Sequence, residues 1–374
     1  MKTNNNSNTS EVRAEQVTNR QAQANQAEAI YLGIDLHKVS ISITRIIDHS
    51  TPQPAQRFTW AKFWGFAQKQ SAQAKKVYAV YEAGAFGFWV QRKLQEMGIQ
   101  CYVAHPEKLD PQHKRVQTDK LDSRHLADKL QRYVLGNTRA MVKVYVPTVA
   151  EEQQRIQARH RRSLAKQLQR LRARGRGLLL SQGIFETTGW WDKSRWERLR
   201  PQVSPELCAA LEDDRALIAE LQKLLDAAEK KLKAAAPKEL PQGFGRRTFA
   251  LLLGEICNYQ RFKSRRSIGG FTGLCGAVSS SGPYHLDLGI NKAGSPYVRA
   301  LLIELAWRTV FWQPDYIGLK PWKQLRDGGG LRNKRRRKIA IVAVARRLAV
   351  DIWKWQTGQV TPEKLGWKMA KAAA

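Results

Sequence analysis

Hydrophobic and polar positions alternate through the first part of the chain, as in half-buried strands. Residues 31–47, rich in Ile and Val, predict two strands joined by a short turn. The pattern beyond them predicts a strand at 56–60, a helix at 61–74, a strand at 77–82, a helix at 88–97, a strand at 99–104 and a helix from about 118 to 136. This β-β-β-α-β-α-β-α order predicts an α/β domain over residues 29–146.

Four carboxylates occupy particular places in that order. Asp35 lies in the first strand, Glu82 ends the fourth, and Asp119 and Asp122 are spaced i, i+3 on the last helix. The order matches the RNase H-like fold, in which three antiparallel strands lead into a parallel section and these places meet at one edge of the sheet. For the two helical aspartates alone, a preference for a helix N-terminus is an equally good explanation.

Carboxylate oxygens are the ligands that Mg²⁺ prefers, and Mn²⁺ is a ready substitute. A pair of such ions stabilises the charge that develops when a phosphodiester is cleaved. The four acids together therefore predict a metal site formed by Asp35, Glu82, Asp119 and Asp122. Three histidines near the acids in sequence, His37, His105 and His125, are expected at the surface or behind the ligands.

Charge indicates the partner. The 374 residues include 64 Lys and Arg against 32 Asp and Glu, a net charge of +32, which favours nucleic acid. No apolar stretch approaches the roughly 18 residues that a membrane span needs. The four cysteines are widely separated, which disfavours zinc and disulfides and suits a reducing cytoplasm. Residues 1–28 are polar and predict a disordered arm without a signal peptide.

A helical connector is predicted over residues 147–237. Residues 151–180 form a basic amphipathic helix, in which Arg162 and Arg170 are candidate contacts to a nucleic-acid backbone. The alternative for this helix is a solvated face. Trp190, Trp191 and Trp196 follow, and burial between helices is favoured over stacking on unpaired bases.

A second long helix begins at Ser204 and Pro205, an N-cap followed by proline at the first helical position. Its apolar positions follow steps of four and three, interrupted by one acid: Leu207, Leu211, Asp214, Ile218, Leu221, Leu225, Ala228 and Leu232. This heptad seam predicts a coiled coil. Pairing between two copies of the chain and packing within one chain are both open.

The remaining chain predicts a mainly α-helical domain at 238–360 and a basic tail at 361–374. A loop rich in Gly and Ser precedes a helix that begins near Ser295, and Ser281 stands before Gly282 and Pro283, where the backbone must turn sharply. Lys292 and Arg299 are candidate phosphate contacts downstream of this serine. Three bases in the run LRNKRRRK are further candidates: Arg335, Arg336 and Arg337.

Taken in order, several motifs resemble one family. They are GIDLHK, YEAGAFGF and TDKLDSRHLADKL in the first domain, and LPQGFG, FTGLCG, SSSG and INKAGSPYVRALLIELAW in the last. The chain resembles the insertion sequence one-ten family of transposases, the bridge-RNA-guided recombinases that include Piv-like DNA invertases. Two departures from the family pattern, Gly276 and the SPY that follows KAG, affect loop shape.

The resemblance implies a RuvC-like domain whose acids bind Mg²⁺, a coiled-coil connector, and a transposase domain with a serine nucleophile. By position that serine is Ser281, with Ser279 and Ser280 within two residues of it. The resemblance also implies strand exchange between donor and target DNA through a covalent phosphoserine. A structured noncoding guide RNA would select the sequence, and homodimers would assemble to tetramers at the bacterial nucleoid.

Two other functions compete with this expectation. The first is a RuvC-type junction endonuclease that uses only the acids, with the last domain as a DNA clamp. The second is a packaging protein for RNA or DNA, in which the acids only balance local charge.

Overall fold

The computed structural model describes residues 26–106, 119–185, 187–282 and 284–370. Most of the predicted N-terminal arm lies outside the described residues, although Ala27 and Glu28 already belong to the first strand. The chain divides into two compact units, residues 1–146 and 147–374, and each is described separately.

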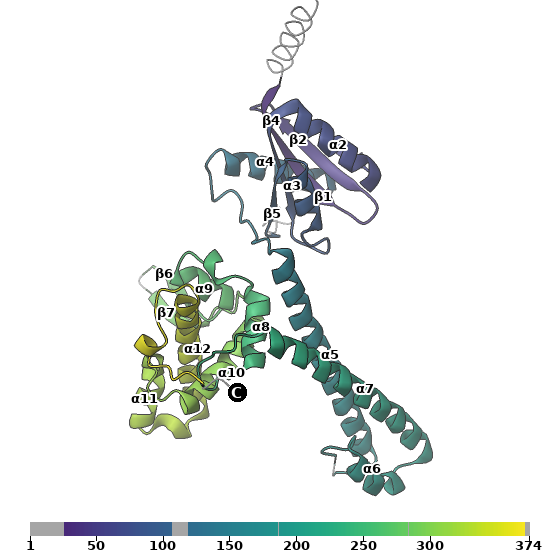
Figure 1. The fold of residues 1–374 in the computed structure, drawn as a ribbon, viewed down its shortest axis with the longest axis vertical. Coiled ribbons are helices and arrows are strands. Elements are labelled where there is room, and N and C mark those ends of the chain that lie inside the picture. Colours follow the sequence, from purple (N-terminus) through teal and green to yellow (C-terminus); the bar gives the residue numbers. More distant parts are fainter. Residues whose placement is uncertain (1–25, 107–118, 186, 283, 371–374) are drawn as a thin grey trace, which may run out of the picture. The chain divides into compact units, whose positions relative to one another are not determined.

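A mixed five-stranded sheet forms the first unit (Figure 1). Its strands are β1 (Ala27–Leu36), β2 (Ile41–Ile47), β3 (Gln56–Phe58), β4 (Ala74–Glu82) and β5 (Gln100–Ala104). The sheet order is β3-β2-β1-β4-β5; the first three strands pair antiparallel, whereas β1, β4 and β5 run parallel. The predicted passage from antiparallel strands to a parallel section is confirmed.

Helices cover both faces of this sheet. The helices are α2 (Trp60–Gln73), α3 (Trp89–Glu96) and α4 (Asp119–Val134). Because strand side chains alternate between faces, Leu32 and Ile34 pack with α2 and α3, while Tyr31 and Val80 pack with α4. Apolar residues fill both faces of the central strands, which is the pattern expected when a sheet is covered on each side.

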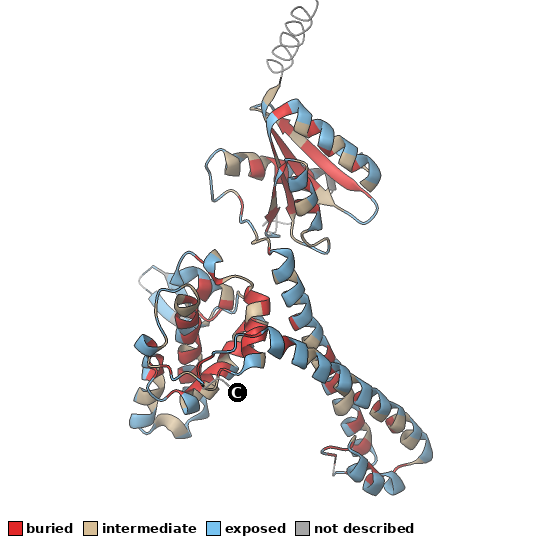
Figure 2. Ribbon diagram, in the orientation of Figure 1, coloured by how far each residue is buried: buried red, intermediate tan, exposed pale blue. Residues whose placement is uncertain are grey.

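The second unit begins with a helical hairpin. Its elements are α5 (Val149–Ser181), α6 (Lys193–Leu199), the short 3₁₀ turn η1 (Arg200–Gln202) and α7 (Pro205–Ala235). Thr148 and Glu151 form a capping box that starts α5. The predicted heptad seam of α7 is its buried side, and it packs against α5 of the same chain. The coiled-coil prediction thus resolves to packing within one chain, while the outer faces of both helices are exposed (Figure 2).

One acid interrupts this seam. Asp214 is 1% exposed, and its Oδ1 accepts a hydrogen bond from Nη1 of Arg174 on α5 at 2.8 Å. Burying a carboxylate is costly unless a charge compensates it. The acid that breaks the heptad pattern is therefore explained by a basic partner on the facing helix.

Tryptophans close the far end of the hairpin. Trp190 is fully buried and Trp196 is 3% exposed, which confirms the prediction of burial. The Trp190 indole donates to the carbonyl of Arg172 at 3.0 Å. Its ring lies where a Cβ on Gly175 would be, so glycine is needed at this position near the C-terminal end of α5.

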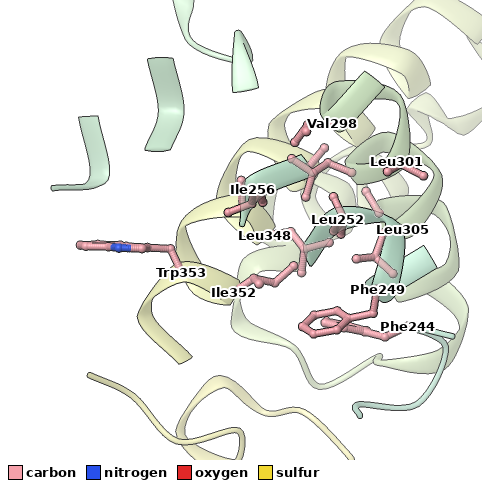
Figure 3. Close-up of a cluster of buried hydrophobic side chains, with 14 of the residues drawn as sticks. Phe244, Phe249, Leu252, Ile256, Val298, Leu301, Leu305, Leu348, Ile352 and Trp353 are labelled. Carbon is pink, nitrogen blue, oxygen red and sulfur yellow. The ribbon is translucent and has the colours of Figure 1, made fainter. Parts of the chain in front are cut away.

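A helical domain completes the unit. Its helices are α8 (Arg246–Ile256), α9 (Arg265–Thr272), α10 (Pro296–Trp312), α11 (Lys320–Asp327) and α12 (Lys334–Gln356). Short 3₁₀ turns are η2 (Tyr259–Arg261), η3 (Ile317–Leu319), η4 (Gly330–Arg332) and η5 (Glu363–Leu365). Apolar side chains of α8, α10 and α12 meet in one core, drawn in Figure 3, where Leu252, Leu305 and Leu348 lie together.

The segment predicted as a basic tail contributes to this core. Leu365 and Trp367 are buried, and Trp367 packs edge-on against Phe244. The side chain of Gln313, itself fully buried, donates to the carbonyls of Gln242 and Lys368, both at 2.9 Å. Residues 361–370 are thus bonded to the start of the domain.

We expect Gly175→Ala to destabilise the hairpin by about 1–3 kcal/mol, because the added methyl overlaps the Trp190 ring. The matched control is Gly177→Ala on the same helix, where a Cβ meets nothing. There the higher helix propensity of alanine should stabilise by up to about 1 kcal/mol. Urea unfolding followed by tryptophan fluorescence measures both; equal effects would reject the contact.

Candidate carboxylate site and serine hairpin

A close contact between α4 and β1 sets the position of the carboxylates. A Cβ on Gly33 would overlap the carbonyl oxygen of Ser123 and the amide nitrogen of Ala127, so the backbone of α4 rests directly on the strand. The Ser123 hydroxyl also lies 3.0 Å from that of Thr44 on β2, in a buried hydrogen bond. The GID motif supplies the glycine that this approach needs.

The register of β1 against β4 then places two of the acids on the face of the sheet that α4 covers. Gly33 pairs with Val80 across the parallel β1–β4 ladder, and both positions face α4. Asp35 and Glu82 lie two residues further along their strands, so they point to that same face. Asp122 directly precedes Ser123 in the first turns of α4. Three of the four predicted acids thus share one face at one end of the sheet.

Asp35 already has a neighbour. Its Oδ2 lies 2.9 Å from Nε2 of His37, and the two side chains are 22% and 47% exposed. The loop after β1 is fixed by Trp60, whose indole donates to the carbonyls of His37 and Lys38 at 3.2 and 3.1 Å. His37 is therefore held beside the Asp35 carboxylate. Its position two residues after Asp35 in the sequence already indicates that the two side chains can meet.

Carboxylates are the type of ligand that a hard cation such as Mg²⁺ binds. Within the part of the chain that the structure describes, no three His, Cys, Asp or Glu side chains gather closely enough to hold a metal ion. Asp119 begins α4, and its side chain is outside the described residues. Mg²⁺ typically keeps several waters and takes only one or two protein carboxylates, with phosphate oxygens completing the shell. Asp35, Glu82 and Asp122 can supply ligands of that kind.

The prediction of a Gly- and Ser-rich loop in the second unit is wrong. Residues there form a β-hairpin, β6 (Gly276–Ser281) and β7 (Tyr284–Ile290) (Figure 1). Ser281 ends β6 and pairs with Tyr284, so the sharp turn predicted beside it is confirmed, with Gly282 at φ +57°. Ser279 and Ser280 are exposed, and the side chain of Ser281 is outside the described residues. Cross-strand hydrogen bonds outweigh the weak strand propensity of Gly and Ser.

Backbone contacts fix the base of the serine hairpin, β6 with β7. The amide of Asn291 donates to the carbonyl of Cys275 at 2.8 Å, and that of Ser295 donates to Phe271 at 2.9 Å. A Cβ on Gly294 would overlap the Phe271 carbonyl, so the KAG loop lies directly on the end of α9. The hairpin is thus held between α9 and α10.

The candidate bases of the helical domain have different surroundings. Lys292 is exposed on a left-handed backbone at φ +59°. Arg299 instead donates from Nη1 to the carbonyl of Thr272 at 3.1 Å, which gives it a structural contact at the end of α9. Arg335 and Arg336 are exposed in the first turn of α12, where cations oppose the helix dipole. Arg337 follows in the same turn and is half-buried.

The two bases of α5 also differ. Arg170 is exposed, whereas the guanidinium of Arg162 lies over the ring of Tyr297 on α10, 4.1 Å from its centroid. Arg162 thus helps to hold α5 against the helical domain, with part of its charge still at the surface. No helix within the described residues is long and apolar enough to cross a membrane.

The chain is similar in sequence to known transposases. Residues 240–319, which contain the serine hairpin, match the profile of the transposase family IS116/IS110/IS902. The chain is 29% identical over 334 residues to the protein y4rJ of Sinorhizobium fredii, named as a transposase, covering 81% of this chain and 83% of the relative. It is 24% identical over 301 residues to the transposase for insertion sequence element IS1533 of Leptospira borgpetersenii, covering 75% and 86%. These similarities support a transposase of an insertion sequence, a DNA-processing enzyme.

We expect Gly33→Ala to displace α4 from the sheet, at a cost of about 1–3 kcal/mol, because the methyl overlaps backbone that cannot rotate away. Hydrogen exchange of the α4 amides should quicken. Gly65→Ala on the exposed side of α2 is the control, since a Cβ there meets nothing. Unchanged exchange in Gly33→Ala would contradict the role given to this contact.

Proposed function

We propose that this transposase cleaves and exchanges DNA strands through a covalent phosphoserine, assisted by Mg²⁺ at a RuvC-like carboxylate site. The observation that carries the proposal is the family match over residues 240–319, which includes the serine hairpin. A serine at the end of a strand beside a tight turn is well placed to approach a bulky substrate. The carboxylates on one face of the sheet support the second part.

The proposed reaction balances as a transesterification. The Ser281 oxygen attacks a DNA phosphorus, a serine–phosphate bond forms, and the bond from phosphorus to one deoxyribose oxygen breaks. The serine proton leaves with that departing oxygen, and attack by a hydroxyl of the partner strand reverses the step on new DNA. Mg²⁺, when bound, stabilises negative charge on the attacking and departing oxygens. Asp35, Glu82, Asp119 and Asp122 would hold it.

Recognition by a structured noncoding RNA belongs to the same proposal. The surplus of bases is spread over several elements, including α5, α9 and α12. Structured RNA is bound through shape and backbone, which suits dispersed positive charge. Dimers that assemble to tetramers would bring serine and acids from different copies together, in the cytoplasm near the nucleoid.

We expect Ser281→Ala to abolish the covalent adduct and to lower excision by about 10³-fold or more, the scale seen when a nucleophile is removed. The chain is expressed with its own insertion element and flanking noncoding DNA, excision junctions are counted by quantitative PCR, and adducts are mapped by mass spectrometry. Ser279→Ala and Ser280→Ala are matched controls. Undiminished cleavage by Ser281→Ala would reject the serine mechanism and leave a junction nuclease that uses only the acids.

Metal binding is tested apart from activity. Mg²⁺ at about 100 times its Kd should stabilise the chain by about 2.7 kcal/mol, seen as a higher Tm. Asp35→Asn should remove this increment because it deletes a charged ligand, whereas Asp128→Asn on α4 should keep it. An equal increment in wild type and Asp35→Asn would exclude Asp35 as a ligand.

A further inference from the structure

Four arginines surround one cavity at the base of the serine hairpin. The cavity has a volume of about 450 Å³ and lies between α9 and α12. Arg265 and Arg266 line it from the first turn of α9, and Arg346 and Arg347 from the middle of α12. We call this the arginine pocket. It belongs wholly to the second unit.

Charge in the arginine pocket is poorly balanced. Its lining includes no acid. Of the four pocket arginines, Arg347 forms an ion pair with Asp351 at 2.8 Å, whereas Arg265, Arg266 and Arg346 form none with the residues that the structure describes. All four arginines are exposed, and like charges gathered on one concave surface repel one another. A bound polyanion would relieve that repulsion.

Arg347 is also held in place. Its Nε donates to Oδ2 of Asp351, a fully buried carboxylate that accepts a second hydrogen bond from the hydroxyl of Tyr316 at 2.8 Å. The guanidinium is therefore fixed before any ligand arrives, which reduces the entropy lost on binding. Planar guanidinium groups bind phosphate oxygens through paired hydrogen bonds.

The pocket is joined to the serine hairpin through its floor. Cys275 lines the pocket and directly precedes β6. A Cβ on Gly269 would stand 2.8 Å from the Cys275 sulfur, so α9 lies close against the start of the strand. Ser281 follows six residues later, roughly 20 Å away along an extended strand. A DNA strand carries one phosphate per roughly 3.4 Å of duplex axis.

We propose that the arginine pocket binds the phosphate backbone of the DNA strand being cleaved, on the order of six nucleotides from the scissile phosphate. The choice of DNA rests on the proposed function, since the pocket lies at the base of the hairpin that carries the serine. Binding through the pocket needs no chemistry, so it is tested independently of the phosphoserine.

The first test is DNA binding by the full-length double variant Arg265→Gln with Arg346→Gln, which removes one charge from each wall. Fluorescence anisotropy with a labelled 30-base-pair duplex from the element end should show about 10- to 100-fold weaker affinity. The slope of log K against log salt should fall by ~1.8, because two phosphate contacts are lost. The control, Arg198→Gln with Lys231→Gln, removes equal charge from exposed positions on α6 and α7.

Equal weakening in the two double variants would overturn the proposal, since only net charge would then matter. Selective loss of binding to a 30-nucleotide RNA, with duplex binding retained, would overturn it in favour of an RNA site. Failure of the phosphoserine test alone leaves these outcomes unaffected, because the anisotropy measures no cleavage.

Cys275 gives a second readout. Alkylation by N-ethylmaleimide, followed by peptide mass spectrometry, should slow several-fold at Cys275 when duplex is added. Cys208 on α7 serves as the internal reference. In the double variant Arg265→Gln with Arg346→Gln, duplex should no longer protect Cys275. An unchanged rate at Cys275 in wild type with saturating duplex would place the DNA elsewhere.

Discussion

Backbone approach closer than a Cβ permits is the constraint on which both candidate sites depend. At Gly33, α4 rests on β1 and brings Asp122 to the face that carries Asp35 and Glu82. At Gly294, the KAG loop rests on α9 and fixes the base of the serine hairpin. Such contacts fix the distance between the two elements, because backbone atoms cannot rotate aside as a long side chain does.

The charged residues have two different roles: some acids pair with bases inside the fold, while the surplus of bases is exposed. Several acids serve buried or half-buried pairs: Asp214 with Arg174, Asp351 with Arg347, and Glu229 with Arg161. The pairs of Asp214 and Glu229 join α7 to α5, whereas Asp351 and Arg347 lie one turn apart on α12. Across the chain, 64 Lys and Arg stand against 32 Asp and Glu, which leaves a surplus of bases and a net charge of +32. The surplus is exposed on α5, on the first turn of α12 and around the arginine pocket, where a polyanionic partner can reach it.

Local pattern was a good guide wherever burial followed a simple period. Alternation predicted the strands, and heptad spacing predicted the buried side of α7, even at Asp214. Pattern was a poor guide at residues 276–290, where Gly and Ser suggested a loop although cross-strand bonding makes a hairpin. It also missed the arginine pocket, because the doublets at 265–266 and 346–347 are far apart in sequence and meet only through packing.

The sequence by itself determined the element order, the strong positive charge, and the candidate acids and serine. Those properties are local or summed, so they survive without any knowledge of contacts. Tertiary structure alone decided that the coiled coil closes within one chain, that Arg299 bonds backbone, and that residues 361–370 belong to the core. These outcomes depend on which surfaces exclude water together, and no residue's own neighbours along the chain specify that.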